Sequence, residues 1–214
     1  MKQGDTVVVA TKNAGKVKEF AHAFGKLGMH VVSMFDYPKL PDVVEDGTTF
    51  SHNARKKAKE VAVALGLPVL ADDSGLEVGL LGGEPGVYSA RYAGPGATDA
   101  LNNAKLLSEL SILTANEGSA LGQLEDGTKL LSPARFVCAL ALFIPSTGEF
   151  VESEGYVEGQ IADQPHGGGG FGYDPLFWLP SHGRAMAELT VEEKQKISHR
   201  GAALAKLLQK LEEV

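Results

Sequence analysis

Residues 6–16 read Thr-Val-Val-Val-Ala-Thr-Lys-Asn-Ala-Gly-Lys. The apolar run from Val7 to Ala10 is bounded by polar residues, which is typical of a buried strand. From Lys16 onward the apolar residues recur at helical spacing, so a turn joins the strand to a helix. The first N–H groups of a helix have no backbone partner and carry partial positive charge, so they suit an anion. The stretch therefore predicts a strand, a phosphate-holding turn and the start of a helix.

The turn itself has residues that favour a phosphate ligand. Gly15 lets the backbone approach a ligand closely, Asn13 tolerates tight turns, and Lys16 adds a full positive charge. The glycine spacing differs from that of the GxxxxGK[ST] phosphate loop. An ordinary strand-to-helix connection with an exposed lysine is the alternative interpretation of this segment.

The rest of the chain predicts a mixed α/β fold. Residues Val17, Phe20, Phe24 and Leu27 give the first helix one apolar face, which Gly28 ends. Further helices are expected at 50–65, at 101–110 with Thr98 as N-cap, at a capping box formed by Thr190 and Glu193, and at 204–211. Strands are expected at 30–34, 69–71, 135–144 and 149–160, with a loop or a small excursion at 114–133.

Composition excludes several classes of protein. The net charge of −7 and the pI of about 5.4 argue against general nucleic-acid binding, which requires a basic surface. No apolar run reaches the roughly 20 residues of a membrane span, and the N-terminus lacks a signal-peptide pattern, so no membrane association is expected. Cys138, the only cysteine, lies in an apolar run and is expected to be buried. We therefore expect a reducing, cytoplasmic location.

Two acidic segments are candidates for metal binding. Asp72 and Asp73 follow the short apolar run 69–71, and Mg²⁺ commonly takes one or two carboxylates. Neighbouring side chains of an extended segment point opposite ways, so one of the two is expected to face a metal. An acidic turn is the alternative interpretation. Glu45 is a second candidate, with a solvated loop as its alternative.

Three further segments supply polar and aromatic groups that suit a nucleotide. The aromatics of Phe171-Gly172-Tyr173-Asp174 can stack on a base, and Asp174 can accept hydrogen bonds from it. Ser198-His199-Arg200 supplies donors ahead of the last helix, with Lys194 one turn earlier. Arg91 is a further cation with no partner identified by the sequence. A packed turn and a solvated helix start are the alternatives.

Five motifs taken together, in this order, resemble one family, the inosine triphosphate pyrophosphatase-like proteins or XTP/dITP diphosphatases. The similarity extends from about residue 6 to residue 211. The motifs are Thr-x-Asn-x-x-Lys at 11–16, Ala-Asp-Asp-Ser-Gly-Leu at 71–76, Gly-Val-Tyr-Ser-Ala-Arg-Tyr at 86–92, Phe-Gly-Tyr-Asp-Pro-Leu-Phe at 171–177 and Ser-His-Arg at 198–200.

The resemblance implies the role of each site residue. The triphosphate is held by Thr11, Lys12, Asn13, Ala14, Gly15 and Lys16. Glu45 and Asp73 bind Mg²⁺, Asp73 is also the proton acceptor, and Ser74 touches the nucleotide. The base pocket and the other nucleotide contacts comprise Phe171, Gly172, Tyr173, Asp174, Lys194, His199 and Arg200, to which we add Arg91. Asp72 stays an alternative base, because the residues alone do not distinguish the two aspartates.

The implied function is Mg²⁺-dependent hydrolysis of ITP, dITP and XTP to the monophosphate and pyrophosphate. The implied fold is a single bilobal domain over 1–214, with a mixed central sheet flanked by helices and the active-site cleft between two lobes. A homodimer is expected from the family. A non-catalytic nucleotide-binding protein and an enzyme for modified pyrimidine triphosphates are the competing hypotheses.

The chain departs from the family pattern at two places. His52 stands where the family usually has Glu, in Thr-Phe-x-Glu-Asn-Ala. The 114–133 stretch is longer than is usual in the family, and its role is not predicted by the sequence.

Overall fold

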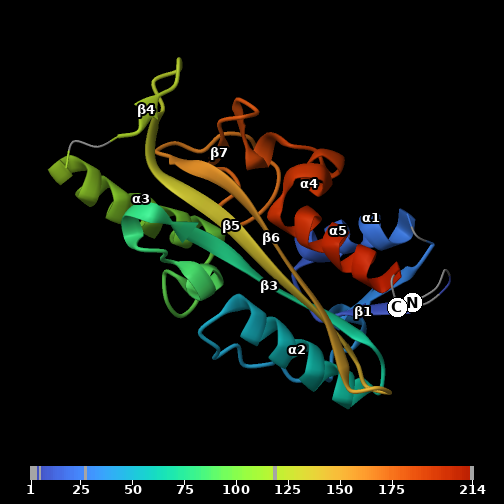
Figure 1. Cartoon of the computed structure of the whole chain (residues 1–214). Helices are drawn as coiled ribbons and strands as arrows, with labels where there is room; N and C mark the ends of the chain where they lie inside the picture. The colour runs from blue at the N-terminus through green and yellow to red at the C-terminus, as the bar shows by residue number, and fades with distance from the viewer. Residues whose placement is uncertain (1–3, 5, 27, 118–119, 213–214) are drawn as a thin grey trace. The chain divides into compact units, whose positions relative to one another are not determined.

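The structure is a computed structural model that describes residues 4, 6–26, 28–117 and 120–212 (Figure 1). The chain divides into two compact units. Unit 1 comprises Met1–Asp73, Cys138–Gly155 and Gln195–Val214, and unit 2 comprises Ser74–Val137 and Tyr156–Lys194. A central sheet flanked by helices confirms the mixed α/β class. The two-lobed arrangement with a cleft stays a prediction.

Unit 1 begins with three parallel strands. Strand β1 (Thr6–Val9) pairs with β2 (His30–Ser33) on one side and with β3 (Val69–Val78) on the other. Helix α1 (Ala14–Lys26) connects β1 to β2 and starts two residues earlier than its apolar spacing predicts. Gly28 ends this connection as expected, because Met29 N donates to Phe24 O at 3.1 Å. Leu27, predicted to lie on the apolar face, is outside the described residues.

Unit 1 also contains the helices α2 (Phe50–Leu65) and α5 (His199–Glu212). Helix α2 has the predicted bounds; Thr49 caps its start, and Gly66, at φ 69°, ends it. Helix α5 packs with α1 on an apolar core that includes Leu70 of β3. The core contains Val7, Val9, Phe20, Ala23, Phe24, Leu70, Cys138, Leu140, Leu142, Ala203, Leu204 and Leu207. Cys138 is buried, as predicted.

Strand β3 differs from the prediction in a way that matters for the site. It continues beyond the predicted strand 69–71 as far as Val78, so Asp72 and Asp73 lie inside a strand rather than after one. The alternation of a strand then sends their side chains to opposite faces. Leu70, two residues before Asp72, belongs to the core shared by α1 and α5. Asp72 therefore points toward those helices, whereas Asp73 points toward α2.

Unit 2 is built on the other halves of three long strands. Besides residues of β3, it contains residues of β5 (Lys129–Ile144) and β6 (Glu149–Ala162), and it adds β7 (Phe177–Leu179) and β8 (Arg184–Ala185) in antiparallel pairing. The rings of Phe136 and Phe177 pack with centroids 4.4 Å apart. Its other elements include η2 (Gly79–Leu81), η3 (Gly86–Arg91), α3 (Asp99–Glu117) and η4 (Met186–Glu188).

Three expectations about local structure have clear outcomes. The stretch 114–133, predicted as a loop or a small excursion, is more regular than a loop, because α3 continues to Glu117 and β4 (Gly122–Gln123) forms a hairpin with β5; residues 118–119 lie outside the described residues. Thr190 and Glu193 form the predicted capping box at the start of α4 (Val191–Ile197). Within the described residues, no helix is long and apolar enough to cross a membrane.

Candidate active site

The turn between β1 and α1 is organised by its own side chains. Asn13 caps α1, because its Oδ1 accepts from Lys16 N at 3.1 Å and its carbonyl accepts from Val17 N at 3.0 Å. Thr11 is buried, and its Oγ1 accepts from Asn13 N at 3.1 Å. These contacts fix the start of α1. The exposed Lys12 pairs with Asp42 at 2.6 Å, on the surface of unit 1.

A buried ionic network joins this turn to β3 and α5. Asp72 is fully buried; its Oδ2 lies 3.0 Å from Lys16 Nζ and 3.2 Å from Arg200 Nη2. Arg200 also pairs with Glu19 of α1. Burial alone would raise the pKa of Asp72, but the charges of Lys16 and Arg200 outweigh it and hold this pKa well below its ordinary value. Asp72 is therefore a permanent carboxylate that holds two cations.

Asp73 has the opposite environment. It is 7 % exposed, and its Oδ2 accepts from Asn53 Nδ2 of α2 at 2.9 Å. Burial raises the pKa of Asp73 to about 6; the Asn53 hydrogen bond lowers it, and the negative charge of Glu45 raises it further. A carboxyl group with this pKa is able to take up a proton near neutral pH. The two neighbouring aspartates therefore have different chemistry.

Helix α2 holds the acidic loop that carries Glu45. Lys57 Nζ pairs with Glu45 and donates to the Asp72 carbonyl at 2.9 Å. Burial acts to lower the pKa of Lys57, but the charges of Asp72 and Glu45 outweigh it and raise this pKa. Asn53 is fully buried, and its Oδ1 accepts from Gly47 N at 2.8 Å. The first two turns of α2 therefore bring the loop and β3 together.

Unit 2 contains the other group of predicted site residues. Asp174 and Lys194 are both buried and form an ion pair at 2.7 Å. Asp174 Oδ2 also accepts from Phe171 N at 2.9 Å, and Lys194 Nζ lies 5.9 Å from the Phe171 ring centroid. Tyr173 Oη donates to Ser89 O at 2.8 Å. The segment 171–174 is thus a folded turn held by Asp174 from within and by contacts with Lys194 and Ser89.

Gly172 is fixed from α3. Its N–H donates to Asp99 Oδ2 at 2.7 Å, and its carbonyl accepts from Asn103 Nδ2 at 3.0 Å. Gly172 has a φ of 62°, a conformation that favours glycine. This contact aligns the turn of the candidate base pocket with the start of a long helix.

Comparisons with known proteins identify the family of the chain. The family model described as Ham1 family matches residues 7–210. The chain belongs to the Ham1 family. It is 51 % identical over 208 residues to the dITP/XTP pyrophosphatase of Geobacillus kaustophilus, covering 97 % of this chain and 95 % of that protein. The streptococcal relatives are longer: the chain is 47 % identical over 206 residues to the Streptococcus pyogenes serotype M18 dITP/XTP pyrophosphatase but covers 58 % of it.

Solved Ham1 structures share the fold. A HAM1 protein from Coxiella burnetii matches with a TM-score of 0.81 and 39 % identity, over 98 % of this chain and 99 % of that one. The Staphylococcus aureus Ham1 protein matches with a TM-score of 0.77 and 40 % identity, over 97 % and 98 %. The resemblance drawn from the five motifs is therefore confirmed at the level of the family.

The structure of this Ham1 protein brings the predicted residues together in two groups. Unit 1 contains Thr11 to Lys16, Glu45, Asp72, Asp73, His199 and Arg200, and unit 2 contains Ser74, Arg91, Phe171 to Asp174 and Lys194. His199 and Arg200 are the first residues of α5 rather than a segment ahead of it. Arg91 is exposed and lies over the Tyr88 ring at 5.1 Å.

Three residues of this Ham1 protein were missed by the motifs: Glu19, Asn53 and Lys57. Asn53 had a detectable signal, because it is a polar residue on the buried face of α2, among Phe50, Ala54 and Ala58. Glu19 had none, because its partner Arg200 is 181 positions away. Long-range ion pairs of this kind leave no local pattern.

A divalent cation fits part of this site. The negative charge of Glu45 acts on Asp73 and raises the pKa of Asp73, and a cation bound between two carboxylates, such as Mg²⁺, would relieve this repulsion. Within the described ranges, no group of three or more His, Cys, Asp or Glu side chains is arranged to hold a metal. A site with two protein carboxylates is consistent with Mg²⁺, which keeps waters and substrate phosphates as its other ligands.

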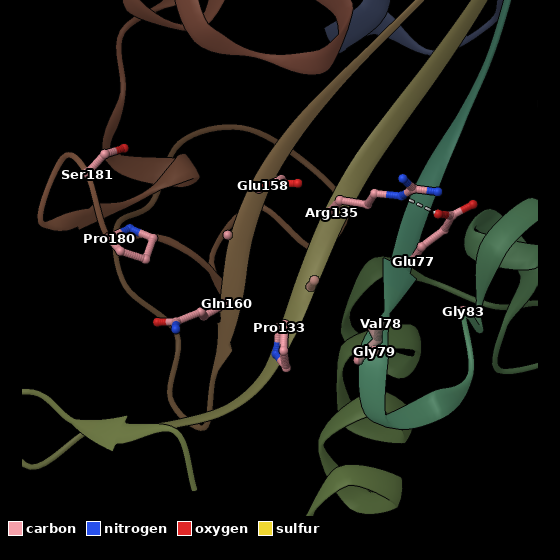
Figure 2. A pocket seen from close by; sticks show the side chains of 12 residues that line it. Glu77, Val78, Gly79, Gly83, Pro133, Arg135, Glu158, Gln160, Pro180 and Ser181 are labelled. Atoms are coloured by element: carbon pink, nitrogen blue, oxygen red, sulfur yellow. Dashed lines mark hydrogen bonds and ion pairs between the residues drawn. The ribbon is translucent and has the colours of Figure 1, made fainter.

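A separate groove of about 670 Å³ lies in unit 2 (Figure 2). Residues of β3, β5 and β6 line it, and two of them, Arg135 of β5 and Glu77 of the neighbouring strand β3, form an ion pair at 2.6 Å. None of the residues predicted from the motifs lines this groove.

Proposed function

We propose that this chain hydrolyses non-standard purine nucleoside triphosphates (ITP, dITP and XTP) to the monophosphate and pyrophosphate, with Mg²⁺. The observation that carries the proposal is the difference between two neighbouring aspartates beside a helix start that suits phosphate. Asp72 pairs with Lys16 and Arg200 and has a lowered pKa, whereas the pKa of the buried Asp73 is raised. The relatives at about 50 % identity are named dITP/XTP pyrophosphatases, which supports the substrate class.

The reaction follows from the groups in unit 1. Water attacks the α-phosphorus, and the bond from that phosphorus to the oxygen that bridges to the β-phosphorus breaks. Pyrophosphate leaves with the electron pair of the broken bond and so gains negative charge. Asp73 accepts the proton of the attacking water, because its pKa of about 6 leaves it ionised yet basic near neutral pH. Asp72 is unsuited to this role, because Lys16 and Arg200 hold its pKa well below the ordinary value and so make it a weak base.

Mg²⁺ would be held by Glu45 and Asp73. When bound, such an ion neutralises charge on the leaving phosphates and lowers the pKa of a coordinated water. Lys16 and the first N–H groups of α1 bind the triphosphate chain from the protein side. Lys57 keeps Glu45 and the backbone of Asp72 in place.

Base selection involves the 6-keto oxygen that inosine and xanthine share. A donor placed at that oxygen faces another donor when the base is adenine, so ATP is expected to react about 100-fold or more slowly. Because the Arg200 guanidinium is buried between Glu19 and Asp72, we assign Arg200 to positioning and His199 to the base. Guanine has the same oxygen, so GTP is the informative competitor.

The test is to incubate the purified chain with ITP and Mg²⁺ and to measure pyrophosphate and orthophosphate separately. Pyrophosphate release is the expected result, and orthophosphate release would refute the reaction. Glu45→Gln is expected to reduce kcat about 100-fold, within the range for a lost catalytic group. The matched control is Asp46→Asn, the exposed neighbour that pairs with Lys56, which is expected to retain activity.

A substrate panel decides between the competing hypotheses. Faster turnover of dTTP or of a modified UTP than of ITP would assign the chain to pyrimidine nucleotides. Tight ITP binding without turnover would make it a binding protein. The exposed His52, which replaces the usual glutamate, leaves the bonds of Asn53 to Gly47 and Asp73 intact, which weighs against a loss of catalysis.

A cytoplasmic homodimer is part of the same proposal. Nucleotide pools are cytoplasmic, and a single buried cysteine is consistent with a reducing compartment. Light scattering of the purified chain is expected to give twice the mass of 22.5 kDa. A monomer would refute the dimer without affecting the reaction.

A further inference from the structure

The start of α2 contacts the Glu45 loop through successive side chains. Lys57 pairs with Glu45, and Lys56 pairs with Asp46 at 2.7 Å. Asn53 accepts a hydrogen bond from Gly47 N at 2.8 Å. Residues 53, 56 and 57 are three and four positions apart, so they share one side of the helix. Asn53 also reaches a β3 carboxylate, because its side chain donates a hydrogen bond to Asp73.

Both ends of the Asn53 amide have a fixed role. Its Oδ1 accepts from Gly47 N, and its Nδ2 donates to Asp73 Oδ2 at 2.9 Å. Reversing the amide would set its NH₂ group against the N–H of Gly47 and its oxygen against the carboxylate, so the partners determine the orientation. Because Asn53 is fully buried, water does not replace either bond.

The loop approaches this amide too closely to carry a side chain. A Cβ at Gly47 would lie 2.6 Å from Asn53 Oδ1 and 3.0 Å from the His52 ring. The backbone of the loop, two residues after Glu45, is therefore in direct contact with the group that orients Asp73. A displacement of the loop at Gly47 or of Asp73 is therefore transmitted to the other through the Asn53 side-chain amide.

We propose that Asn53 is the positioning residue that sets the Glu45 loop and Asp73 at the separation a divalent cation requires, an inference that rests on the proposed function. Second-layer hydrogen bonds of this type typically change metal affinity or activity by about 10- to 100-fold when they are removed. Asn53 has no role in holding the triphosphate, because its bonds go to the loop and to β3.

The experiment compares three variants of the full chain with the wild type. Asn53→Ala removes both bonds, and Gly47→Ala displaces the same amide from the loop side. The matched control is Lys56→Ala, which removes a contact from the same helix to the same loop without reaching Asp73. Mn²⁺ is titrated by electron paramagnetic resonance into each protein, both alone and with the α,β-methylene analogue of ITP, and Mg²⁺ displaces it.

The expected result is a loss of Mn²⁺ affinity of about 10- to 100-fold in Asn53→Ala and Gly47→Ala, with Lys56→Ala close to the wild type. Steady-state kinetics are expected to show a matching fall in kcat at fixed Mg²⁺, with the KM for ITP nearly unchanged. A role limited to folding would lower the melting temperature and leave the Mn²⁺ affinity of the folded fraction unaltered.

The outcomes separate this inference from the proposed function. Wild-type Mn²⁺ affinity in folded Asn53→Ala and Gly47→Ala overturns the inference, as does an equal loss in Lys56→Ala. Absence of Mn²⁺ binding by the wild type overturns it too. If the wild type releases no pyrophosphate while Asn53→Ala still weakens Mn²⁺ binding, the reaction assignment fails and the inference stands. Should Asn53→Ala fail to fold, Gly47→Ala gives the result.

Discussion

Substituting Asp73 by Asn is expected to stabilise the metal-free protein while abolishing its activity. Burial raises the pKa of Asp73 from 3.8 to about 6. Each pKa unit corresponds to about 1.4 kcal/mol, so ionised Asp73 costs the folded state about 3 kcal/mol. Asn has the same shape without the charge, and its Oδ1 can accept the hydrogen bond that Asn53 donates. The variant is therefore expected to be more stable than the wild type at about pH 8.

The stability difference between Asp73→Asn and the wild type is expected to grow as the pH rises. Below about pH 4 both the folded and the unfolded chain keep the Asp73 proton, so the two proteins are expected to be equally stable. Between about pH 4 and 6 the unfolded chain loses this proton first, and the wild type loses stability relative to the variant as the pH rises. Above about pH 6 the whole difference is present.

Thermal unfolding in EDTA, followed by circular dichroism over this pH range, is the assay. For a chain of this length 1 kcal/mol corresponds to about 2–4 °C, so Asp73→Asn is expected to melt roughly 6–12 °C higher at about pH 8. Added Mg²⁺ is expected to raise the melting temperature of the wild type alone. A variant that melts below the wild type, or a difference independent of pH, would refute the assigned environment of Asp73.

The remaining predictions concern other parts of unit 1. Asp72→Asn leaves the positive charges of Lys16 and Arg200 without their carboxylate and is expected to destabilise the folded protein by about 3–5 kcal/mol, whereas Asp73→Asn is expected to stabilise it. Equal stability of Asp72→Asn and the wild type in urea unfolding would contradict the ionic network. Gly155→Ala places a Cβ 2.3 Å from His199 O and is expected to cost about 3 kcal/mol, whereas the control Gly122→Ala has open space and is expected to be neutral. Burial raises the pKa of the Cys138 thiol to about 12, so Ellman's reagent is expected to label it only after denaturation, and rapid labelling of the native protein would disprove its burial.

The sequence predicts the elements of unit 1 well where periodicity and caps agree. Helix α2 combines an apolar face with Thr49 before it and Gly66 after it, so its bounds follow from local chemistry. The start of α1 was displaced by two residues, because Asn13 caps the helix earlier than the apolar spacing indicates. Side-chain capping at this turn determines the boundary, and apolar periodicity does not detect it.

The length of strand β3 was underestimated for a physical reason. Two adjacent aspartates followed by Ser-Gly have the composition of a turn. They remain in a strand because Lys16, Arg200 and Asn53, from three different helices, satisfy their carboxylates. Such partners are supplied by tertiary structure, which overrides local propensity.

The alternation of β3 also has a consequence for how the family changes over time. Asp72 and Asp73 look like a duplicated residue, yet the parity of the strand assigns one to a cationic core and the other to a loop-facing amide. A single-residue insertion or deletion within 69–71 would turn each aspartate to the opposite face of the strand, as a one-residue register slip does in any strand. Neither aspartate can therefore replace the other. The function depends on the position of each aspartate along the strand as much as on its identity.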